Sequence, residues 1–257
     1  MRWTIKPKPK QEDIDVLANA LQVDDLVAQL LLHRGITTFE QAKSFFRPQL
    51  SELHDPFLMK DMDLAVKRIE EAIGNDENIL VFGDYDVDGT TAVALLSSYL
   101  LSYYPNVATY IPDRYDEGYG VSFKGLDFAE DNGFSLIVAL DCGVKAIDKV
   151  AYAKEKGVDF IICDHHRPGK TLPDAIAVLD PKREDCSYPF DELCGCGVGF
   201  KLIGENRILA FYGLQVINQQ PRIGFKAIID QLNKKELTIT DVVFIIAPRI
   251  NAAGRMK

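Results

Sequence analysis

Residues 79–101 read ILVFGDYDVDGTTAVALLSSYLL and contain three patterns in succession. Residues 79–82 form a short apolar run that is typical of a buried strand. Residues 83–89 are rich in glycine and aspartate, which favours a turn or a binding loop. Residues 90–101 place apolar side chains at helical spacing. The stretch therefore predicts a strand, a loop and a helix, the repeating unit of α/β proteins.

The same alternation continues through the middle of the chain. Four more strands and two more helices are predicted, the strands at 107–111, 136–140, 160–163 and 175–179 and the helices at 125–132 and 146–156. Strands that are apolar along their whole length are typical of parallel sheets covered on both faces. We therefore expect an α/β fold with a doubly wound, mainly parallel sheet, in which ligands bind beyond the carboxyl ends of the strands.

The amino-terminal part of the chain has a helical pattern. Apolar residues recur at three and four positions from Gln11 to about Ile73, which predicts short helices, the last of them at 62–73. Residues 37–40, TTFE, have the Thr-x-x-Glu form of a capping box with Thr37 or Thr38 as the N-cap. We expect a helical region over residues 1–73 and an α/β domain over residues 74–257.

Composition narrows the class of protein. No apolar run approaches the roughly 20 residues that span a bilayer, and the amino terminus lacks the apolar stretch of a secretory signal, so we expect a cytoplasmic protein without membrane contact. The five cysteines are odd in number and irregularly spaced, which favours free thiols. Cys194 and Cys196 are too close together for the usual zinc-binding pair.

The formal net charge of −9 counts against simple binding of nucleic acid, because proteins that track phosphates usually present a basic face. The objection weakens if the acidic residues hold divalent cations, which invert the local charge. It also weakens if a basic module belongs to the complete protein.

Acidic and imidazole side chains follow three of the predicted strands. Asp84, Asp86 and Asp88 follow the first strand, Asp141 follows the third, and Asp164, His165 and His166 follow the fourth. Each aspartate alone could cap a helix or form a turn. Three aspartates at alternate positions, however, repel one another strongly unless a cation neutralises them. Oxygen and nitrogen ligands together favour manganese or magnesium, so the sequence predicts a divalent metal site.

The two adjacent histidines suggest different roles, because regular secondary structure would not direct both rings at one atom. We expect His165 to bind metal and His166 to hydrogen-bond a substrate phosphate or act as a general acid. Asp164 would orient an imidazole. Two metal ions at such a site indicate hydrolysis of a phosphoester. A kinase is disfavoured, since the chain has no Gly-x-x-x-x-Gly-Lys-Ser/Thr loop.

Residues 83–92, GDYDVDGTTA, and residues 164–166, DHH, together resemble the signature motifs of the DHH phosphoesterases, and specifically of the RecJ exonucleases. Further segments resemble RecJ in the same order, among them IPDRYDEGYG at 111–120, CGVGF at 196–200 and PRINAAGR at 248–255. The resemblance covers nearly the whole chain. It implies a single-strand-specific 5′-to-3′ DNA exonuclease of DNA repair and recombination, with Mn²⁺ or Mg²⁺ in a two-metal site.

Residue by residue, the resemblance implies a set of metal ligands, namely Asp86, Asp88, Asp141 and His165, with Asp84 joining or supporting them. It implies substrate binding by His166, Arg114, Tyr115, Asn251, Gly254 and Arg255. For Tyr115 and Tyr119, packing within a loop remains as open as base stacking. The implied partners are single-stranded DNA, a single-strand-binding protein and a helicase, and a monomer is the default state.

The chain departs from the RecJ pattern at two places. RecJ-like proteins carry a further Asp motif between the GVGF helix and the GENR segment, but here Ile203 is followed directly by Gly204. A helix that starts near Gly197 would have barely one turn before Gly204, too short to cover a sheet. We therefore expect that several tens of residues, including a metal-ligating Asp, are missing near 203/204. Family members also continue beyond Lys257 into further domains that bind DNA.

Two other functions remain open. A DHH hydrolase of short oligonucleotides, cyclic dinucleotides or polyphosphate would share the metal site, but residues 113–120 and the amino-terminal helices resemble the exonuclease. An inactive scaffold of the same fold would have lost the catalytic residues, which are present here. Binding of manganese would separate the scaffold from the enzymes.

Overall fold

The computed structural model describes residues 4–49, 52–102 and 104–199, together with 218–219, 226, 228–230, 232, 237–238 and 241–246. Contacts within the chain divide it into two compact units, Met1–Glu52 and Leu53–Lys257. The expected gap near 203/204 and three predicted substrate-binding residues, Asn251, Gly254 and Arg255, lie outside the described residues.

The first unit contains three short helices, α1 (Gln11–Leu21), α2 (Asp25–Leu32) and α3 (Phe39–Phe46), around a small apolar core. Thr38 is the N-cap of α3, and its partner in the capping box is Gln41. The sequence offered Thr37 or Thr38 as the N-cap, and the structure selects Thr38. The prediction that Glu40 completes the box was wrong, because with Thr38 as the N-cap the third helical residue is Gln41.

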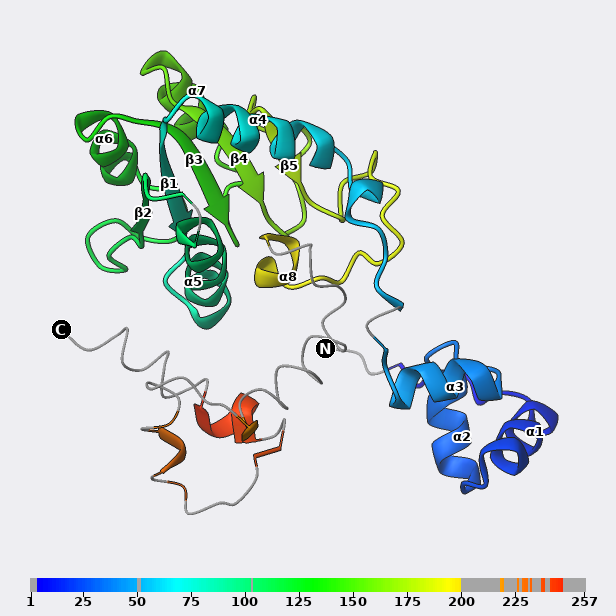
Figure 1. Cartoon of the computed structure of the whole chain (residues 1–257). Coiled ribbons are helices and arrows are strands. Elements are labelled where there is room, and N and C mark those ends of the chain that lie inside the picture. The colour runs from blue at the N-terminus through cyan, green and yellow to red at the C-terminus, as the bar shows by residue number, and fades with distance from the viewer. Residues whose placement is uncertain are drawn as a thin grey trace. The chain divides into compact units, whose positions relative to one another are not determined.

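The second unit is built on a five-stranded sheet in the order β2-β1-β3-β4-β5, with every pair of neighbours parallel (Figure 1). The strands are β1 (Asn78–Gly83), β2 (Val107–Tyr110), β3 (Phe134–Leu140), β4 (Asp159–Cys163) and β5 (Ala177–Leu179). The chain runs outward in one direction to β2 and in the other to β3, β4 and β5. This arrangement confirms the predicted doubly wound α/β fold and places the switch point between β1 and β3.

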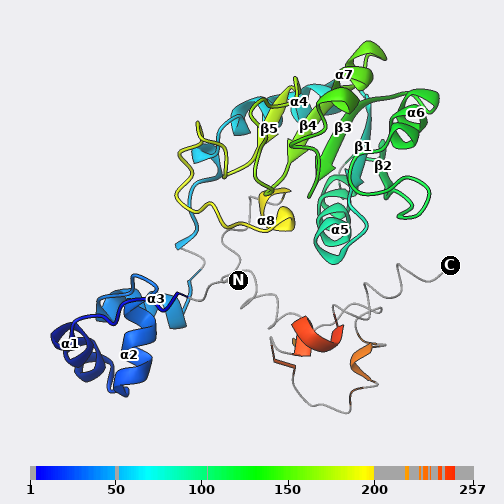
Figure 2. The ribbon, with the colours of Figure 1, turned by 180° about the vertical axis from the view of Figure 1, so that it is seen from behind.

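Helices cover both faces of this sheet (Figure 2). One face carries α4 (Met62–Gly74), α5 (Val87–Leu101) and α8 (Gly195–Gly199), and the other carries α6 (Phe123–Asp131) and α7 (Ile147–Glu155). Two short elements complete the described structure, the 3-10 helix η2 (Pro56–Leu58) and the π-helical turn η4 (Val242–Ile246). The core strands are buried on both sides, as their continuous apolar sequences predict.

Helix α4 belongs to the unit of the sheet. Its residues Met62, Ala65 and Ala72 lie in the same apolar cluster as Val81 of β1 and Val138 of β3. The compact units therefore divide at 52/53 and not after residue 73. Helical periodicity alone does not reveal which surface a helix covers.

Among the described residues, no helix is both long and apolar enough to cross a membrane.

Candidate metal centre

The carboxyl ends of four strands carry buried carboxylates. Asp84 follows β1, Asp141 follows β3, Asp164 follows β4 and Asp180 follows β5, with exposed fractions of 0%, 2%, 1% and 0%. Because parallel strands end at the same edge of a sheet, these four side chains lie along that edge. A buried carboxylate is unfavourable unless hydrogen bonds or a cation compensate it.

Three of these carboxylates retain an oxygen without a hydrogen-bond partner among the described residues, namely Asp84 Oδ2, Asp141 Oδ1 and Asp180 Oδ2. Burial raises the pKa of Asp84, and burial together with the charges of Asp88 and Asp86 raises the pKa of Asp141 to about 6. Burial and the neighbouring Asp164 raise the pKa of Asp180 to about 6. The edge is therefore short of positive charge, a condition that a divalent cation relieves.

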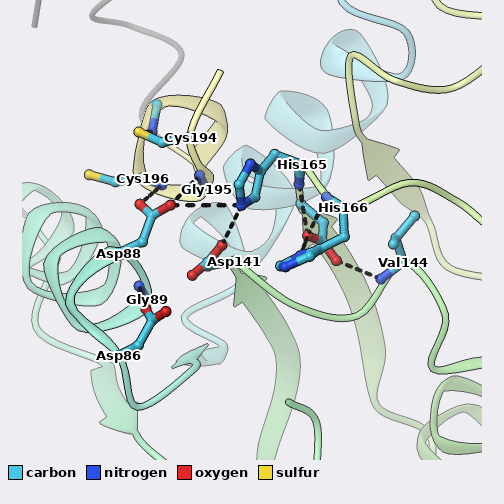
Figure 3. Close-up of polar contacts among 12 residues, drawn as sticks. Asp86, Asp88, Gly89, Asp141, Val144, His165, His166, Cys194, Gly195 and Cys196 are labelled. Carbon is cyan, nitrogen blue, oxygen red and sulfur yellow. Dashed lines mark hydrogen bonds and ion pairs between the residues drawn. The ribbon is translucent and has the colours of Figure 1, made fainter. Parts of the chain in front are cut away.

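The carboxylate of Asp141 lies beside the imidazole of His165. Nε2 of His165 is 3.2 Å from Oδ1 of Asp141 and 3.8 Å from Oδ2 of Asp88, without the geometry of a hydrogen bond (Figure 3). Asp141 also has a left-handed backbone with φ of 61°, which is uncommon for residues other than glycine. A non-glycine residue held in this conformation at a strand end is often part of a functional site.

The structure brings both histidines to Asp141. One ligand atom each from Asp141, His165 and His166 lie within 4.8 Å of one another, close enough to surround a single ion. The two rings are 4.7 Å apart at their centroids. Both residues follow β4 outside regular secondary structure, which allows adjacent rings to approach one carboxylate. Their separate roles stay a prediction.

Asp164 differs from the other strand-end carboxylates because it is fully hydrogen-bonded. It accepts from the backbone amides of Val144, His165 and His166 and lies 2.7 Å from Nδ1 of His166. Although burial opposes ionisation, the His166 ring and these amides lower the pKa of Asp164. In return, the hydrogen bond to Asp164 raises the pKa of His166. The imidazole that Asp164 orients is thus that of His166, and Nε2 is left to face the site, 3.1 Å from the hydroxyl of Tyr119.

The two remaining aspartates of the DYDVDG loop are bound to helix amino termini. Asp86 is the N-cap of α5, and its Oδ1 accepts from the amide of Gly89 at 3.0 Å. Asp88 accepts from the first amides of α8, those of Gly195 at 2.8 Å and Cys196 at 2.7 Å (Figure 3). These carboxylates therefore have the helix-capping role that any single aspartate of the loop could have had.

Close approach of the backbone fixes the geometry around these carboxylates. A Cβ at Gly195 would lie 2.1 Å from Oδ1 of Asp141, and a Cβ at Gly89 would lie 2.4 Å from the carbonyl oxygen of Asp84. Both distances are far inside van der Waals contact. The loop after β1 and the start of α8 can therefore pack against the carboxylates only because these two residues are glycine.

A line of ring contacts leads from Arg114 to the site. The Arg114 guanidinium lies 5.0 Å from the centre of the Tyr85 ring. The Tyr85 and Tyr119 rings are 6.2 Å apart at their centroids, and the Tyr119 and His166 rings are 6.1 Å apart. Tyr115 is 61% exposed. The predicted substrate residue Arg114 is thus connected to the centre through two aromatic rings, whereas Tyr115 faces outward.

The structure adds residues that the sequence did not assign to the site. Asp180 follows β5 directly and is not among the residues that the sequence analysis assigns to the metal site. The rule that identified Asp141, a carboxylate directly after an apolar strand, would have identified Asp180 as well. The contact of Tyr119 with His166 and the approach of Gly195 to Asp141 depend on tertiary packing, and no local sequence signal predicts them.

Comparison with known proteins places this geometry in a family. The DHH family, N-terminal domain, matches residues 78–227. The single-stranded-DNA-specific exonuclease RecJ of Bacillus subtilis is 38% identical over 286 aligned positions, which cover 100% of this chain and 36% of that protein. Since this chain has 257 residues, at least 29 positions of the alignment have no residue here. The chain spans less than half the length of this relative.

Two solved structures of RecJ are similar as well. RecJ of Thermus thermophilus in complex with Mn²⁺ has a TM-score of 0.76 and 26% identity, covering 99% of this chain and 40% of its own. An exonuclease RecJ bound to manganese has a TM-score of 0.67 and 30% identity, and the match covers 77% of this chain and 58% of that one. RecJ proteins match the chain along its length, and the chain belongs to the DHH family.

Proposed function

We propose that this chain is the catalytic part of a metal-dependent exodeoxyribonuclease that hydrolyses phosphodiester bonds of single-stranded DNA from the 5′ end. The observation that carries the proposal is the convergence of Asp141, His165 and His166 within 4.8 Å, in a chain that RecJ relatives match along its length. The catalytic domain in this proposal is the unit of the sheet, and the helices of residues 1–52 are an extension of it.

The proposed metal ligands are Asp141 and His165, with Asp84, Asp86 and Asp88 contributing further oxygens. The unpartnered oxygens of Asp84 and Asp141 fit a cation, and the mixed carboxylate and imidazole donors suit Mn²⁺ or Mg²⁺. A carboxylate that caps a helix can still offer lone pairs to a metal. When bound, two such ions supply Lewis acidity at the phosphate and an activated water.

His166 is proposed to contact the scissile phosphate. Asp164 holds Nδ1, so Nε2 is the atom that can donate a proton to a phosphate oxygen or to the leaving oxygen. The raised pKa of His166 favours the protonated form, which is the form needed for either task. Nε2 is also within reach of the Tyr119 hydroxyl, which could hold the ring in place before substrate arrives.

The DNA strand is proposed to approach along Arg114, Tyr85 and Tyr119, where a guanidinium and aromatic rings suit phosphates and bases. Tyr115 would contribute an exposed ring, and Asn251, Gly254 and Arg255 would hold the nucleotide. We also propose that the protein acts in DNA repair and recombination, in the cytoplasm and as a monomer. Its proposed partners are a single-strand-binding protein and a helicase. Five free cysteines suit a reducing compartment.

We further propose that the site lacks one ligand. The alignment with the Bacillus relative contains at least 29 positions without a residue here, a number that fits a missing segment of several tens of residues. The short helix before residue 204 is the reason to place that segment near 203/204. If that segment carries a metal-ligating Asp, the chain should bind the second metal ion weakly. The remaining ligands, Asp141 and His165, would still hold the first.

The experiment that tests this function is manganese-dependent digestion of 5′-phosphorylated single-stranded and double-stranded DNA. The chain is compared with a version in which the missing segment and the carboxyl-terminal domains of the Bacillus relative are restored. Digestion of single strands from the 5′ end, at least by the restored version, supports the proposal. If neither version digests DNA but either one hydrolyses dinucleotides, the function is that of a small-substrate DHH hydrolase.

A further inference from the structure

A cavity lies beside the candidate metal centre. It has a volume of about 240 Å³ and is bounded on one side by Asp164 and His166 and on the other by the loop of residues 142–146 that leads into α7. Tyr119 forms part of the wall. His166 therefore belongs both to this cavity and to the cluster with Asp141 and His165.

Two lysines line this cavity in a chain whose net charge is −9. The side chain of Lys145 is exposed, and Lys145 lines the same cavity as His166. Lys149 is half-buried, 3.6 Å from the exposed carboxylate of Asp148 and over the ring of Phe123. Exposed ion pairs of this kind contribute little, so Lys149 can bind another anion at small cost.

The backbone at the cavity is also suited to an anion. Its wall includes Ala146, the N-cap of α7, which makes no side-chain hydrogen bond to the first turn. The amides at a helix amino terminus carry partial positive charge and bind phosphate readily. The cavity therefore combines two ammonium groups, an uncapped helix end and an imidazole with one carboxylate, that of Asp164, whose oxygens already accept hydrogen bonds from the protein. This excess of donors fits a phosphate.

We propose that this cavity binds the phosphate of the nucleotide next to the scissile bond, with Lys145 and Lys149 as its contacts. The inference rests on the proposed function, because it assigns the metal centre to the scissile phosphate. Consecutive phosphates of one strand would then lie on either side of His166, with Tyr119 beside the intervening sugar or base. Such a site would require a substrate with at least two phosphates in a row, and would favour a strand over a mononucleotide.

The test is the salt dependence of binding to a fluorescent oligothymidylate with phosphorothioate linkages, which slow hydrolysis, in the presence of Mn²⁺. Each phosphate contact to single-stranded nucleic acid contributes about 0.7 to the slope of log K against log salt concentration. The variant Lys145→Ala/Lys149→Ala removes the contacts to one phosphate and should therefore have a slope shallower by about 0.7. Lys145→Arg/Lys149→Arg should retain the slope, because it keeps both charges.

The matched control is Lys67→Ala/Lys154→Ala, which removes the same charge from exposed positions on α4 and α7. Its slope should equal that of the unaltered chain. An unchanged slope in the Lys145 and Lys149 variant, or an equal reduction in the control, overturns the phosphate site alone. If neither the unaltered chain nor the version with the restored segment and domains binds the oligonucleotide at low salt, the proposed function fails, and the phosphate site fails with it.

Discussion

Two pairs of aspartates at the same edge of the sheet have opposite surroundings. Asp84 and Asp141 are buried and each has an oxygen without a hydrogen-bond partner. Asp86 and Asp88 accept backbone amides at the amino termini of α5 and α8. The first pair destabilises the chain unless a cation is present, whereas the second pair contributes to folding with or without one.

The difference shows that a cluster of like residues need not share one role. The capping pair holds α5 and α8 in place, and α8 in turn brings Gly195 against Asp141. The unpartnered pair is left with negative charge that the protein itself does not neutralise. Substitutions can separate these roles, because a change in metal affinity and a change in the free energy of unfolding are measured independently.

The largest effect is expected for His165→Ala. Loss of a proposed metal ligand should lower Mn²⁺ affinity by more than about 100-fold, since even partners that only orient ligands are worth about 10–100-fold. The fold should persist, because His165 lies beyond the end of β4 and not in the core. Isothermal titration measures the Mn²⁺ affinity, and circular dichroism checks that the variant is folded. Unchanged affinity would remove His165 from the site.

Gly195→Ala should disturb both pairs at once. The added methyl group would overlap Oδ1 of Asp141, so α8 must shift away from its contacts with Asp88. Overpacking of this kind costs about 1–3 kcal/mol of stability, and Mn²⁺ affinity should fall as well. Urea denaturation without metal and the manganese titration measure the two effects. Gly157→Ala is a useful comparison, because a Cβ there meets no atom within 4 Å but is also strained by a positive φ of 74°.

Asp88→Ala should destabilise the chain even without metal. It removes two hydrogen bonds from backbone amides to a charged acceptor, each worth about 1.5–3 kcal/mol, although the partial exposure of Asp88 and water that replaces it reduce the loss. Asp141→Asn, which suits a left-handed backbone, should leave the stability without metal unchanged or raise it. Equal destabilisation by both substitutions in urea would show that the two pairs do not differ as described.

The smallest change in stability is expected for substitutions of Asp86, and these separate its role as a helix cap from its proposed role as a metal ligand. Serine also caps helices well, so Asp86→Ser should retain the stability that Asp86→Ala loses, about 1 kcal/mol. Both variants lack the carboxylate and should bind Mn²⁺ equally weakly. If Asp86→Ser binds Mn²⁺ like the unaltered chain, Asp86 acts only as a helix cap. Urea denaturation and manganese titration of the two variants decide between these results.

Local patterns predicted the sheet and the residues at its edge because strand and helix periodicity and strand-end loops are properties of short segments. The position of Asp84 or Asp141 after an apolar run required no knowledge of packing. The pairing of Asp88 with the amides of residues 195 and 196 joins segments about a hundred residues apart, and no local pattern encodes it. The same reason explains the unit boundary at 52/53, since the docking of α4 on the sheet is a tertiary contact.

The joint approach of His165 and His166 to Asp141 was also beyond sequence reasoning. It depends on the irregular path of the chain after β4 and on the four hydrogen-bonding contacts that Asp164 makes with its neighbours. Sequence spacing describes regular structure well and irregular loops poorly. Their chemistry predicted that these residues would lie together at the strand ends, as Asp141, His165 and His166 do. Their mutual orientation came from the structure.

The most direct test of the metal centre is the stability of the chain and of Asp141→Asn with and without Mn²⁺, measured by urea denaturation. A ligand that binds only the folded chain stabilises it by about 2.7 kcal/mol at a concentration 100 times its dissociation constant. The unaltered chain should gain stability as Mn²⁺ is added, and Asp141→Asn should gain little or none. Equal stabilisation of both proteins, or none of either, would contradict a metal centre at the carboxyl ends of these strands.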